Sequence, residues 1–417
     1  MEINPLYPSW RNITAMHIEL TNRCNAGCPM CPRYINQGKE INPLLNLTEV
    51  TLEQFKTWFP VDFVKQLRRV YACGNYGDPI AAKDTLSIFK YLRENGNDDL
   101  ALVMHTNASA RSEGWWKELG QILNGENGRD DGVTFSVDGL WDTNHLYRRN
   151  TNFDKIYANM KAFTSAGGIA KWDFIAFDFN EHQLDEAKEI ARELGFRTFN
   201  IKRTTRWMGY DATGRGYYRV KNPDGSSYYI RQPEESRLKH QNDVVFAKAI
   251  KNLIPQFITN DEFNRLMPEG TEEFMVNYDP ETGEQIKIKH NSLNILCRAK
   301  INKYQANNEI FLSSTGHVFP CCFLGGEPWR YGAQWSNPND NSLKMIELNG
   351  GMDSLDLHKN TLEEIINTPY FQRYLPLSFE VGSSMRSHQC SSCCGLEFNK
   401  LDQGELGNNR NHVNEVQ

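Results

Sequence analysis

Segments with strand-like and helix-like periodicity alternate through residues 15 to 205, and this alternation restricts the fold of the chain more than any other feature. Helical patterns of apolar residues run over Thr85–Glu94, Phe153–Ser165 and Glu181–Leu194. Six apolar stretches typical of strands lie between such patterns: Ala15–Leu20, Arg69–Cys73, Leu100–His105, Gly132–Val137, Trp172–Phe179 and Phe196–Lys202. Repeated strand–helix units predict a parallel α/β sheet, and six of them predict a partial (β/α)6 TIM-like barrel with its active site at the carboxyl ends of the strands.

The segment Glu181–Leu194 gives the clearest helical pattern, with its apolar residues on one face. Asn180 and Gln183 resemble a capping box at its start, and Gly195 is expected to end it.

Three cysteines, Cys24, Cys28 and Cys31, directly follow the first predicted strand. An iron–sulfur cube has four irons, so three cysteines in one short loop can bind three of them and leave the fourth open to a substrate or cofactor. A structural zinc loop is the alternative. Structural zinc, however, prefers four ligands in paired CxxC knuckles.

The Cys-x3-Cys-x2-Cys spacing after a first strand resembles the signature loop of the radical S-adenosylmethionine (SAM) enzymes. Further motifs resemble those of the family and occur in the same order. The segment Gly74-Asn-Tyr-Gly77-Asp78-Pro79 resembles the Gly-Gly-Glu-Pro motif that holds the amino group of SAM, with Asp in place of Glu. The run His105-Thr106-Asn107 resembles the Thr-Asn-Gly of the family, and Phe135-Ser136-Val-Asp138-Gly139 resembles its Ser-x-Asp-Gly.

Two more features complete this resemblance. One arginine of the pair Arg148–Arg149 is expected to reach the SAM carboxylate, and the sequence leaves open which one. Met30 stands where the family usually has an aromatic residue, and it could pack on the adenine ring. The resemblance thus implies these cofactor-binding residues: Met30, Gly77, Asp78, Pro79, Thr106, Asn107, Ser136, Asp138, Arg148 and Arg149.

The resemblance also implies an activity. A [4Fe-4S] cluster on Cys24, Cys28 and Cys31 would cleave SAM reductively to a 5′-deoxyadenosyl radical, which abstracts a hydrogen atom from a substrate carbon. Cys73, at the end of the second predicted strand, could return a hydrogen atom in an epimerase, although such a cysteine is more often a small core residue.

Six further cysteines lie between residues 297 and 394. The Gly316-x4-Cys321 step after Cys297, followed by a distal CxxC, resembles the SPASM and Twitch domains that follow the barrel in many radical SAM enzymes. The x5-Cys-x3-Cys extension that follows the CxxC in a SPASM domain is missing, so the chain is closer to a Twitch-like α+β domain with one auxiliary [4Fe-4S] cluster. The candidate ligands are Cys297, Cys321, Cys390 and one of Cys393 and Cys394, with Cys322 left open as an alternative to Cys321. A zinc ribbon is the other interpretation.

A bridging region separates these two parts. The expected boundaries are 1–205 for the barrel, 206–295 for the bridging region, 296–398 for the auxiliary domain and 399–417 for a frayed tail. Two tyrosine-rich segments around Asn222-Pro-Asp-Gly225 predict a β-hairpin against the barrel mouth. From Arg197 to Lys239 ten basic residues face four acidic ones, which suits an anionic substrate or RNA, or simply a solvated hairpin whose tyrosines pack across strands.

The composition favours a cytoplasmic enzyme with reduced thiols, since the N-terminus lacks a secretory pattern and no stretch reaches membrane-spanning length. The net charge of −6 does not mark the whole chain as a nucleic-acid binder. The expected partners are a small-molecule or peptide substrate and a reductant such as flavodoxin or ferredoxin. An auxiliary cluster favours oxidation of the substrate. The open alternatives are a tRNA- or nucleotide-modifying enzyme, an epimerase, and a non-catalytic iron–sulfur or zinc protein.

Overall fold

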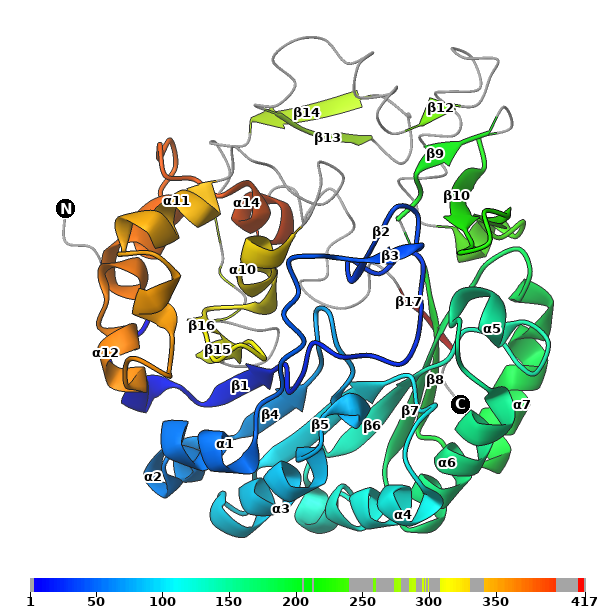
Figure 1. The fold of residues 1–417 in the computed structure, drawn as a ribbon, viewed down its shortest axis with the longest axis horizontal. Helices are drawn as coiled ribbons and strands as arrows, with labels where there is room; N and C mark the ends of the chain where they lie inside the picture. Colours follow the sequence, from blue (N-terminus) through cyan, green and yellow to red (C-terminus); the bar gives the residue numbers. More distant parts are fainter. Residues whose placement is uncertain are drawn as a thin grey trace.

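The computed structural model describes residues 4–204, 206–211, 214–239, 308–330, 341–394 and 412–415, with short pieces between 258 and 299. About half of the expected bridging region and most of the expected tail therefore lie outside the described residues. Six parallel strands form the centre of the fold: β1 (Ala15–Ile18), β4 (Arg69–Ala72), β5 (Ala101–Thr106), β6 (Gly132–Ser136), β7 (Ala170–Ile175) and β8 (Thr198–Lys202). They follow one another in chain order across a curved sheet, so the predicted partial barrel is confirmed (Figure 1).

The sheet extends beyond these six strands on both sides. β15 (Glu309–Leu312) pairs in parallel with β1, and β16 (Val318–Phe319) pairs antiparallel with β15. At the other edge β17 (His412–Glu415) pairs antiparallel with β8. Four residues of the tail, which was expected to fray, therefore complete a nine-stranded sheet.

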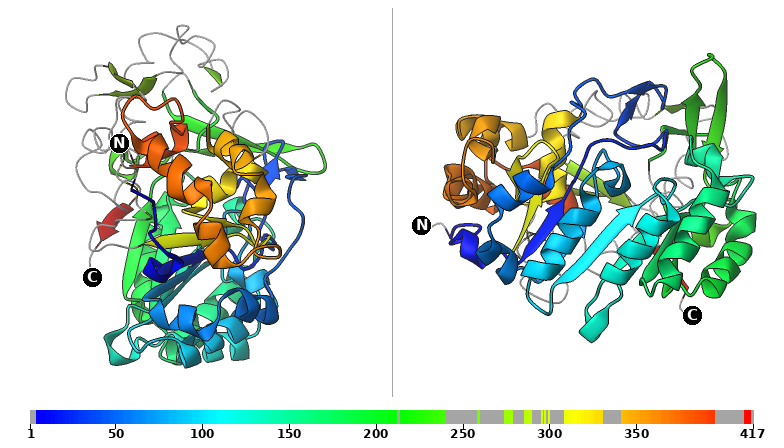
Figure 2. Two further views of the ribbon diagram at one scale, coloured as in Figure 1. Left: turned by 90° about the vertical axis from the view of Figure 1, so that its left-hand side faces the viewer. Right: turned by 60° about the horizontal axis from the view of Figure 1, so that its bottom comes forward.

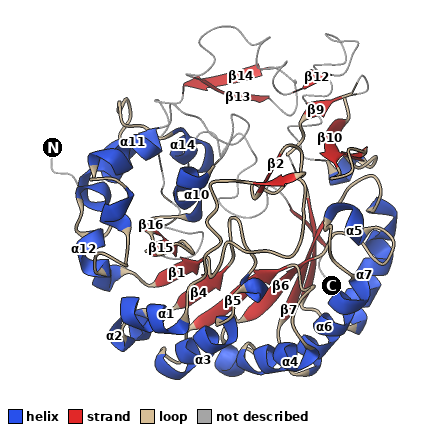
Figure 3. Ribbon diagram, in the orientation of Figure 1, coloured by secondary structure: helices blue, strands red, loops and turns tan. Residues whose placement is uncertain are grey.

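Helices cover the outer face of the sheet (Figure 3). They are α1 (Leu52–Trp58), α2 (Val61–Gln66), α3 (Thr85–Asn95), α4 (Glu113–Ile122), α6 (Phe153–Ser165) and α7 (Leu184–Glu193). The packing beneath them is aromatic, because Trp116 of α4 and Phe163 of α6 both lie against Phe135 of β6, with ring centroids 5.6 and 5.5 Å apart. The expected core face of α7 is buried, and Gly195 ends that helix with a φ of +74°, a conformation that glycine adopts without strain.

The expected capping box at Asn180 and Gln183 is wrong. Asn180 makes no side-chain capping bond to the helix. Its Nδ2 instead donates to the carbonyl oxygens of Asp138 and Ile175, and its Oδ1 accepts from the backbone N–H of Phe177. The Asn180 side chain thus joins the loops after β6 and β7, because a buried amide there satisfies backbone groups that no strand pairs.

Smaller elements lie above the inner face of the sheet. The loop after β1 carries the short strands β2 (Tyr34–Ile35) and β3 (Glu40–Ile41). The predicted hairpin is confirmed as β10 (Gly216–Lys221) and β11 (Ser227–Arg231), in one sheet with β9 (Gly209–Tyr210) and β12 (Ile258–Thr259). β13 (Phe274–Tyr278) and β14 (Gln285–Lys289) pair with each other.

The C-terminal part packs beside β1 (Figure 2). It follows β15 and β16 with α10 (Cys322–Gly326), α11 (Asn341–Leu348), α12 (Leu362–Ile366), α13 (Leu375–Phe379) and α14 (His388–Cys394). A short α-helix, α5 (Asn144–Tyr147), follows β6, and a π-helix covers Tyr370–Tyr374. The 3-10 helices are Trp10–Asn12, Pro79–Ala81, Glu126–Gly128, Glu181–Gln183, Ser236–Leu238, Glu327–Trp329 and Met352–Leu355. One core cluster runs from the barrel helices into these C-terminal helices. In the described ranges, no helix has both the length and the apolar character that a membrane crossing requires.

Candidate functional site

A cavity of about 560 Å³ opens above the carboxyl ends of the barrel strands. Ten of the residues expected from the sequence line it: Cys24, Cys28, Cys31, Cys73, Gly77, Asp78, Thr106, Asn107, Ser136 and Arg148. They come from the loops after β1 and β4, from the carboxyl ends of β5 and β6, and from Arg148 directly after α5, so four separate sequence motifs and an arginine meet at one place. Met30, Pro79, Asp138 and Arg149 do not line it.

The loop that carries the three cysteines is held in place by backbone contacts. Gly27 donates its N–H to the carbonyl of Arg149 at 2.8 Å, and Arg149 Nε donates to the carbonyl of Gly27 at 2.7 Å. The same guanidinium also donates to the carbonyl of Gly38. Arg149 thus joins the middle of the cysteine loop to the turn between β2 and β3, while the adjacent Arg148 reaches the cavity.

The hairpin covers the back of this loop. Tyr218 of β10 donates its hydroxyl to the carbonyl of Pro29 at 2.9 Å, and burial raises the pKa of Tyr218 to about 12. Met30 is fully buried in the apolar cluster that also contains Trp207 and Tyr218, so the structure gives its side chain a packing role. Tyr217 and Tyr218 are buried, whereas Tyr229 is exposed.

The three thiols are chemically suited to a metal cluster. Burial raises the pKa of Cys28 to about 11 and also raises the pKa values of Cys24 and Cys31. Without metal the thiols are therefore neutral, and metal binding must release their protons. Thiolates are the soft ligands that iron–sulfur clusters require, and three of them on one cavity wall fit a cluster with one open iron. Within the described ranges, no three His, Cys, Asp or Glu side chains are arranged to hold a single metal ion.

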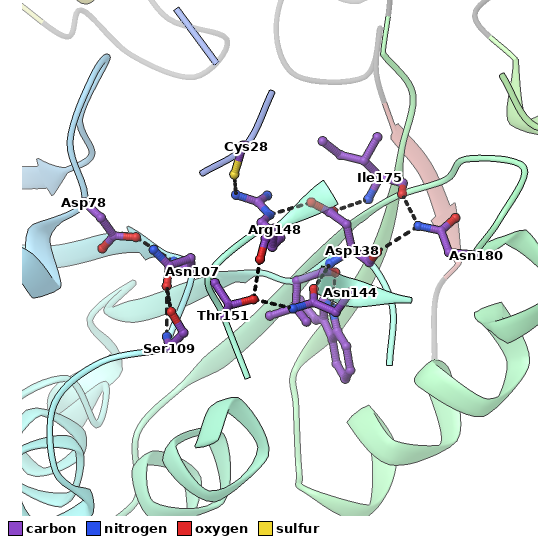
Figure 4. Close-up of polar contacts among 12 residues, drawn as sticks. Cys28, Asp78, Asn107, Ser109, Asp138, Asn144, Arg148, Thr151, Ile175 and Asn180 are labelled. Carbon is purple, nitrogen blue, oxygen red and sulfur yellow. Dashed lines mark hydrogen bonds and ion pairs between the residues drawn. The ribbon is translucent and has the colours of Figure 1, made fainter. Parts of the chain in front are cut away.

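Arg148 belongs to a buried polar network (Figure 4). Its Nε donates to Asp138 Oδ2 at 2.6 Å, and its Nη1 lies 3.7 Å from Cys28 Sγ. Asp138 Oδ1 accepts from the backbone N–H of Ile175 at 2.6 Å. Burial raises the pKa of Asp138, and the guanidinium of Arg148 opposes that rise. The ion pair fixes the guanidinium at the cavity edge with further N–H groups available for an anion.

Asp78 is the only acidic residue on the cavity wall among the described residues. Its Oδ2 accepts from the backbone N–H of Asn107 at 2.7 Å, and its Oδ1 accepts from that of Ile80 at 3.1 Å. Burial raises its pKa, and the bond from Asn107 opposes this most. Gly77 must be glycine, because a Cβ there would lie 1.7 Å from the carbonyl oxygen of Thr21. The two motif loops therefore touch backbone to backbone.

Sequence reasoning missed Glu19, which organises the loop after β4. Its Oε1 accepts from the backbone N–H groups of Tyr76 at 2.7 Å and Gly77 at 3.0 Å. Burial raises the pKa of Glu19 to about 7, opposed by these backbone bonds. The available signal was an acidic residue inside the apolar run that precedes the cysteine loop.

The floor of the cavity is also polar. Cys73 and His105 line it, and Tyr71 packs edge-on against His105 with ring centroids 4.9 Å apart. Burial raises the pKa of Cys73 to about 11 and lowers the pKa of His105 to about 3, so both groups are neutral near pH 7. Among charged residues, the cavity also has Arg33, Arg206 and Arg330 on its wall, none of which the sequence singled out.

The second group of cysteines surrounds a smaller cavity of about 100 Å³. All six of its thiols line this space: Cys297, Cys321, Cys322, Cys390, Cys393 and Cys394. Cys322, Phe323 and Gln389 line both cavities and form a common wall. Asn75 Nδ2 donates to the carbonyl of Cys322 at 2.7 Å, so the loop after β4 is bonded to this wall.

No protein-family model matches the chain, and no curated protein matches it. Solved structures that it resembles in part include Streptococcus suis SuiB bound to its precursor peptide SuiA, with 15% identity, a TM-score of 0.42, and coverage of 78% of this chain and 65% of that one. Another is anSMEcpe with bound AdoMet and the Cp18Cys peptide, with 13% identity, a TM-score of 0.44, and coverage of 94% and 91%. A third is archaeal TYW1, with 10% identity, a TM-score of 0.24, and coverage of 42% and 60%. The chain thus spans slightly under two thirds of SuiB.

Proposed function

We propose that this protein is a radical SAM enzyme with one auxiliary iron–sulfur cluster. The observation that carries this proposal is the larger cavity, in which Cys24, Cys28 and Cys31 share a wall with Asp78 and Arg148. These residues come from different strand ends, and a structural zinc loop would not need an acid and an arginine beside its thiols. When bound, the cluster would supply an electron that cleaves SAM to methionine and a 5′-deoxyadenosyl radical, which takes a hydrogen atom from a substrate carbon.

The chain's own residues would bind and orient SAM. Arg148 has N–H groups beyond those bonded to Asp138 and Cys28, and they can donate to the SAM carboxylate. Asp78 can accept from the SAM ammonium, because a carboxylate has about four acceptor sites and three of those on Asp78 are used, by Asn107, Ile80 and Thr106. Ser136 and Thr106 add hydroxyl groups on the same wall. Gly77 and Pro79 would shape the loop, and Asp138 would hold Arg148.

The smaller cavity supports an auxiliary [4Fe-4S] cluster. Burial and the neighbouring Cys322, Cys297 and Cys390 raise the pKa of Cys321, whereas burial and the neighbouring Glu309, Cys73 and Cys393 raise the pKa of Cys322. We assign Cys297, Cys321, Cys390 and one of Cys393 and Cys394 as ligands. Cys322 is assigned to the wall toward the larger cavity. A substrate beside that wall would lie close to both clusters, which favours oxidation.

The substrate would be a peptide or a small molecule, and the reductant would be a flavodoxin or a ferredoxin. An RNA substrate is the second candidate because the hairpin is basic. Two observations weigh against it: Tyr217 and Tyr218 are buried, and Tyr218 donates to the cysteine loop. Binding of RNA that weakens with rising salt concentration would support an RNA substrate. An epimerase using Cys73 is the third.

The test is anaerobic reconstitution followed by an assay for SAM cleavage, with iron, sulfide and zinc counted on the same sample. Two cubes predict about eight irons per chain, from four irons per cluster. The matched variant replaces Cys24, Cys28 and Cys31 by alanine and should keep about four irons while losing SAM cleavage. Zinc without iron in both cysteine groups would refute the proposal and support a non-catalytic zinc protein. In a second pair of variants, Cys321→Ser should lose the auxiliary irons and Cys322→Ser should keep them.

A further inference from the structure

Two side chains donate N–H groups toward sulfurs of the cysteine loop. Arg148 Nη1 lies 3.7 Å from Cys28 Sγ, and Asn107 Nδ2 lies 3.6 Å from Cys24 Sγ. Both distances are within hydrogen-bond range for a sulfur acceptor, and a thiolate accepts more strongly than a thiol because it carries the charge. Each donor thus faces a different one of the three cysteines.

Arg148 is held in this position from several sides (Figure 4). Its Nε is bonded to buried Asp138, whose other oxygen is fixed by a backbone N–H of β7. Its backbone N–H donates to the carbonyl of Asn144, and its carbonyl accepts from Thr151. Burying a charged pair costs free energy, and here the pair fixes the direction of a guanidinium toward a sulfur.

Asn107 is oriented as firmly. Its Oδ1 accepts from the backbone N–H of Ser109 at 2.9 Å, so its amide nitrogen is the group that faces Cys24, and the same nitrogen donates to Asn25 Oδ1 at 3.1 Å. Its own backbone N–H donates to Asp78. The turn after β5 therefore fixes which end of the amide meets the sulfur, independently of Arg148.

We propose that Arg148 and Asn107 are positioning residues that hydrogen-bond the sulfurs of Cys28 and Cys24 and raise the reduction potential of the cluster bound there. This inference rests on the proposed function. Reduction adds negative charge, part of which resides on the ligand sulfurs, so a donor or a positive charge stabilises the reduced cluster more than the oxidised one. Hydrogen bonds to the sulfurs and net charge are two of the factors that set the reduction potential of an iron–sulfur cluster in a protein.

Arg149 provides a natural comparison. It carries the same charge one residue further along, but its guanidinium donates to the carbonyls of Gly27, Gly38 and Lys221 and, among the described residues, makes no bond to a sulfur. If positive charge alone raised the reduction potential of the cluster, Arg148 and Arg149 would both raise it. If a hydrogen bond to sulfur raises it, Arg148 would do so and Arg149 would not.

The experiment is a redox titration of the reconstituted protein, followed by electron paramagnetic resonance without SAM. The signal of this cluster is identified by its loss when Cys24, Cys28 and Cys31 are replaced by alanine. In Arg148→Gln we expect the equilibrium for reduction to become about tenfold less favourable, which is about 59 mV for one electron. Arg148→Lys, which keeps the charge, should shift less, and Asn107→Ala should shift in the same direction.

The outcomes separate this inference from the proposed function. A wild-type protein that takes up no iron refutes the proposed function itself. Unchanged potentials in Arg148→Gln and Asn107→Ala, at wild-type iron content, overturn the inference and leave the proposed function intact. An equal shift in Arg149→Gln would also overturn it, because charge alone would then suffice. If Arg148→Gln does not retain its cluster, Asn107→Ala alone decides.

Discussion

Replacing Glu19 by glutamine should change how stability depends on pH. Burial raises the pKa of Glu19 from 4.5 to about 7, opposed by the bonds from Tyr76 and Gly77. The folded protein therefore favours the protonated carboxyl, so the contribution of this group to stability is fully present below pH 4.5. It is lost as the pH rises through about 7. At about 1.36 kcal/mol per pKa unit, this shift corresponds to about 3 kcal/mol.

Glutamine keeps one carbonyl oxygen as an acceptor for the two N–H groups but cannot ionise. The stability of Glu19→Gln minus that of the wild type should therefore rise by about 3 kcal/mol between pH 4.5 and pH 8. Hydrogen exchange at the amides of Tyr76 and Gly77 measures this difference locally. The ratio of wild-type to variant exchange rates should rise roughly a hundredfold over that range, because each 1.4 kcal/mol corresponds to about a factor of ten.

Comparing both proteins at the same pH removes the intrinsic pH dependence of exchange. Glu53→Gln, at a side chain that is 83% exposed on α1, is the matched control. A ratio that stays flat for Glu19→Gln would refute the reasoning, since the carboxyl would then ionise equally easily in the folded and unfolded chains.

Three further outcomes follow from the site. Asp78→Ala should weaken SAM binding, measured by calorimetry, by roughly 1.5 to 3 kcal/mol, the range for hydrogen bonds to charged groups. Unchanged affinity would show that the loop of Asp78 is a structural turn that does not bind SAM. Replacing Cys390 and Cys393 by alanine should allow 5′-deoxyadenosine formation without oxidised product; full product from a variant that melts like the wild type would make the auxiliary site structural. Tyr218→Phe should cost about 0.5 to 1.5 kcal/mol by losing its bond to Pro29, and an unshifted thermal midpoint would show that this bond adds no stability.

The strands of the barrel could be predicted from local patterns, because each is a short apolar run between turns. The error at β7 shows the limit of that reasoning. The expected strand Trp172–Phe179 ends at Ile175, because Phe177 is buried in the following loop, where its ring packs against Trp207 at 6.1 Å. An apolar residue in a strand and one in a buried loop look alike in sequence. β15 was beyond reach for another reason, since its pairing with β1 joins residues far apart in the chain.

Ten of the cavity-lining residues were predictable because they stand in recognisable motifs, whereas others, such as Arg33, Arg206 and Arg330, were not. The choice between Arg148 and Arg149 was not, because adjacent residues differ only in the direction their side chains take. The role of Glu19 could not be predicted either, because its partners are backbone N–H groups, and every residue type except proline has one. Interactions with backbone atoms decide much of this site, and a residue pattern does not record them.

The position of β15 has a consequence for the order in which the chain matures. β1 pairs on one side with β4 and on the other with β15, and Glu19 donates its N–H to the carbonyl of Leu312 at 2.8 Å. While the ribosome is still making the middle of the chain, β1 is an open edge with unpaired backbone groups, which invites pairing with other strands. The cysteine loop starts from the end of that strand. Iron loading of this loop should therefore follow the synthesis of β15, and a protein cut before Glu309 should aggregate through β1 instead of forming a stable sheet.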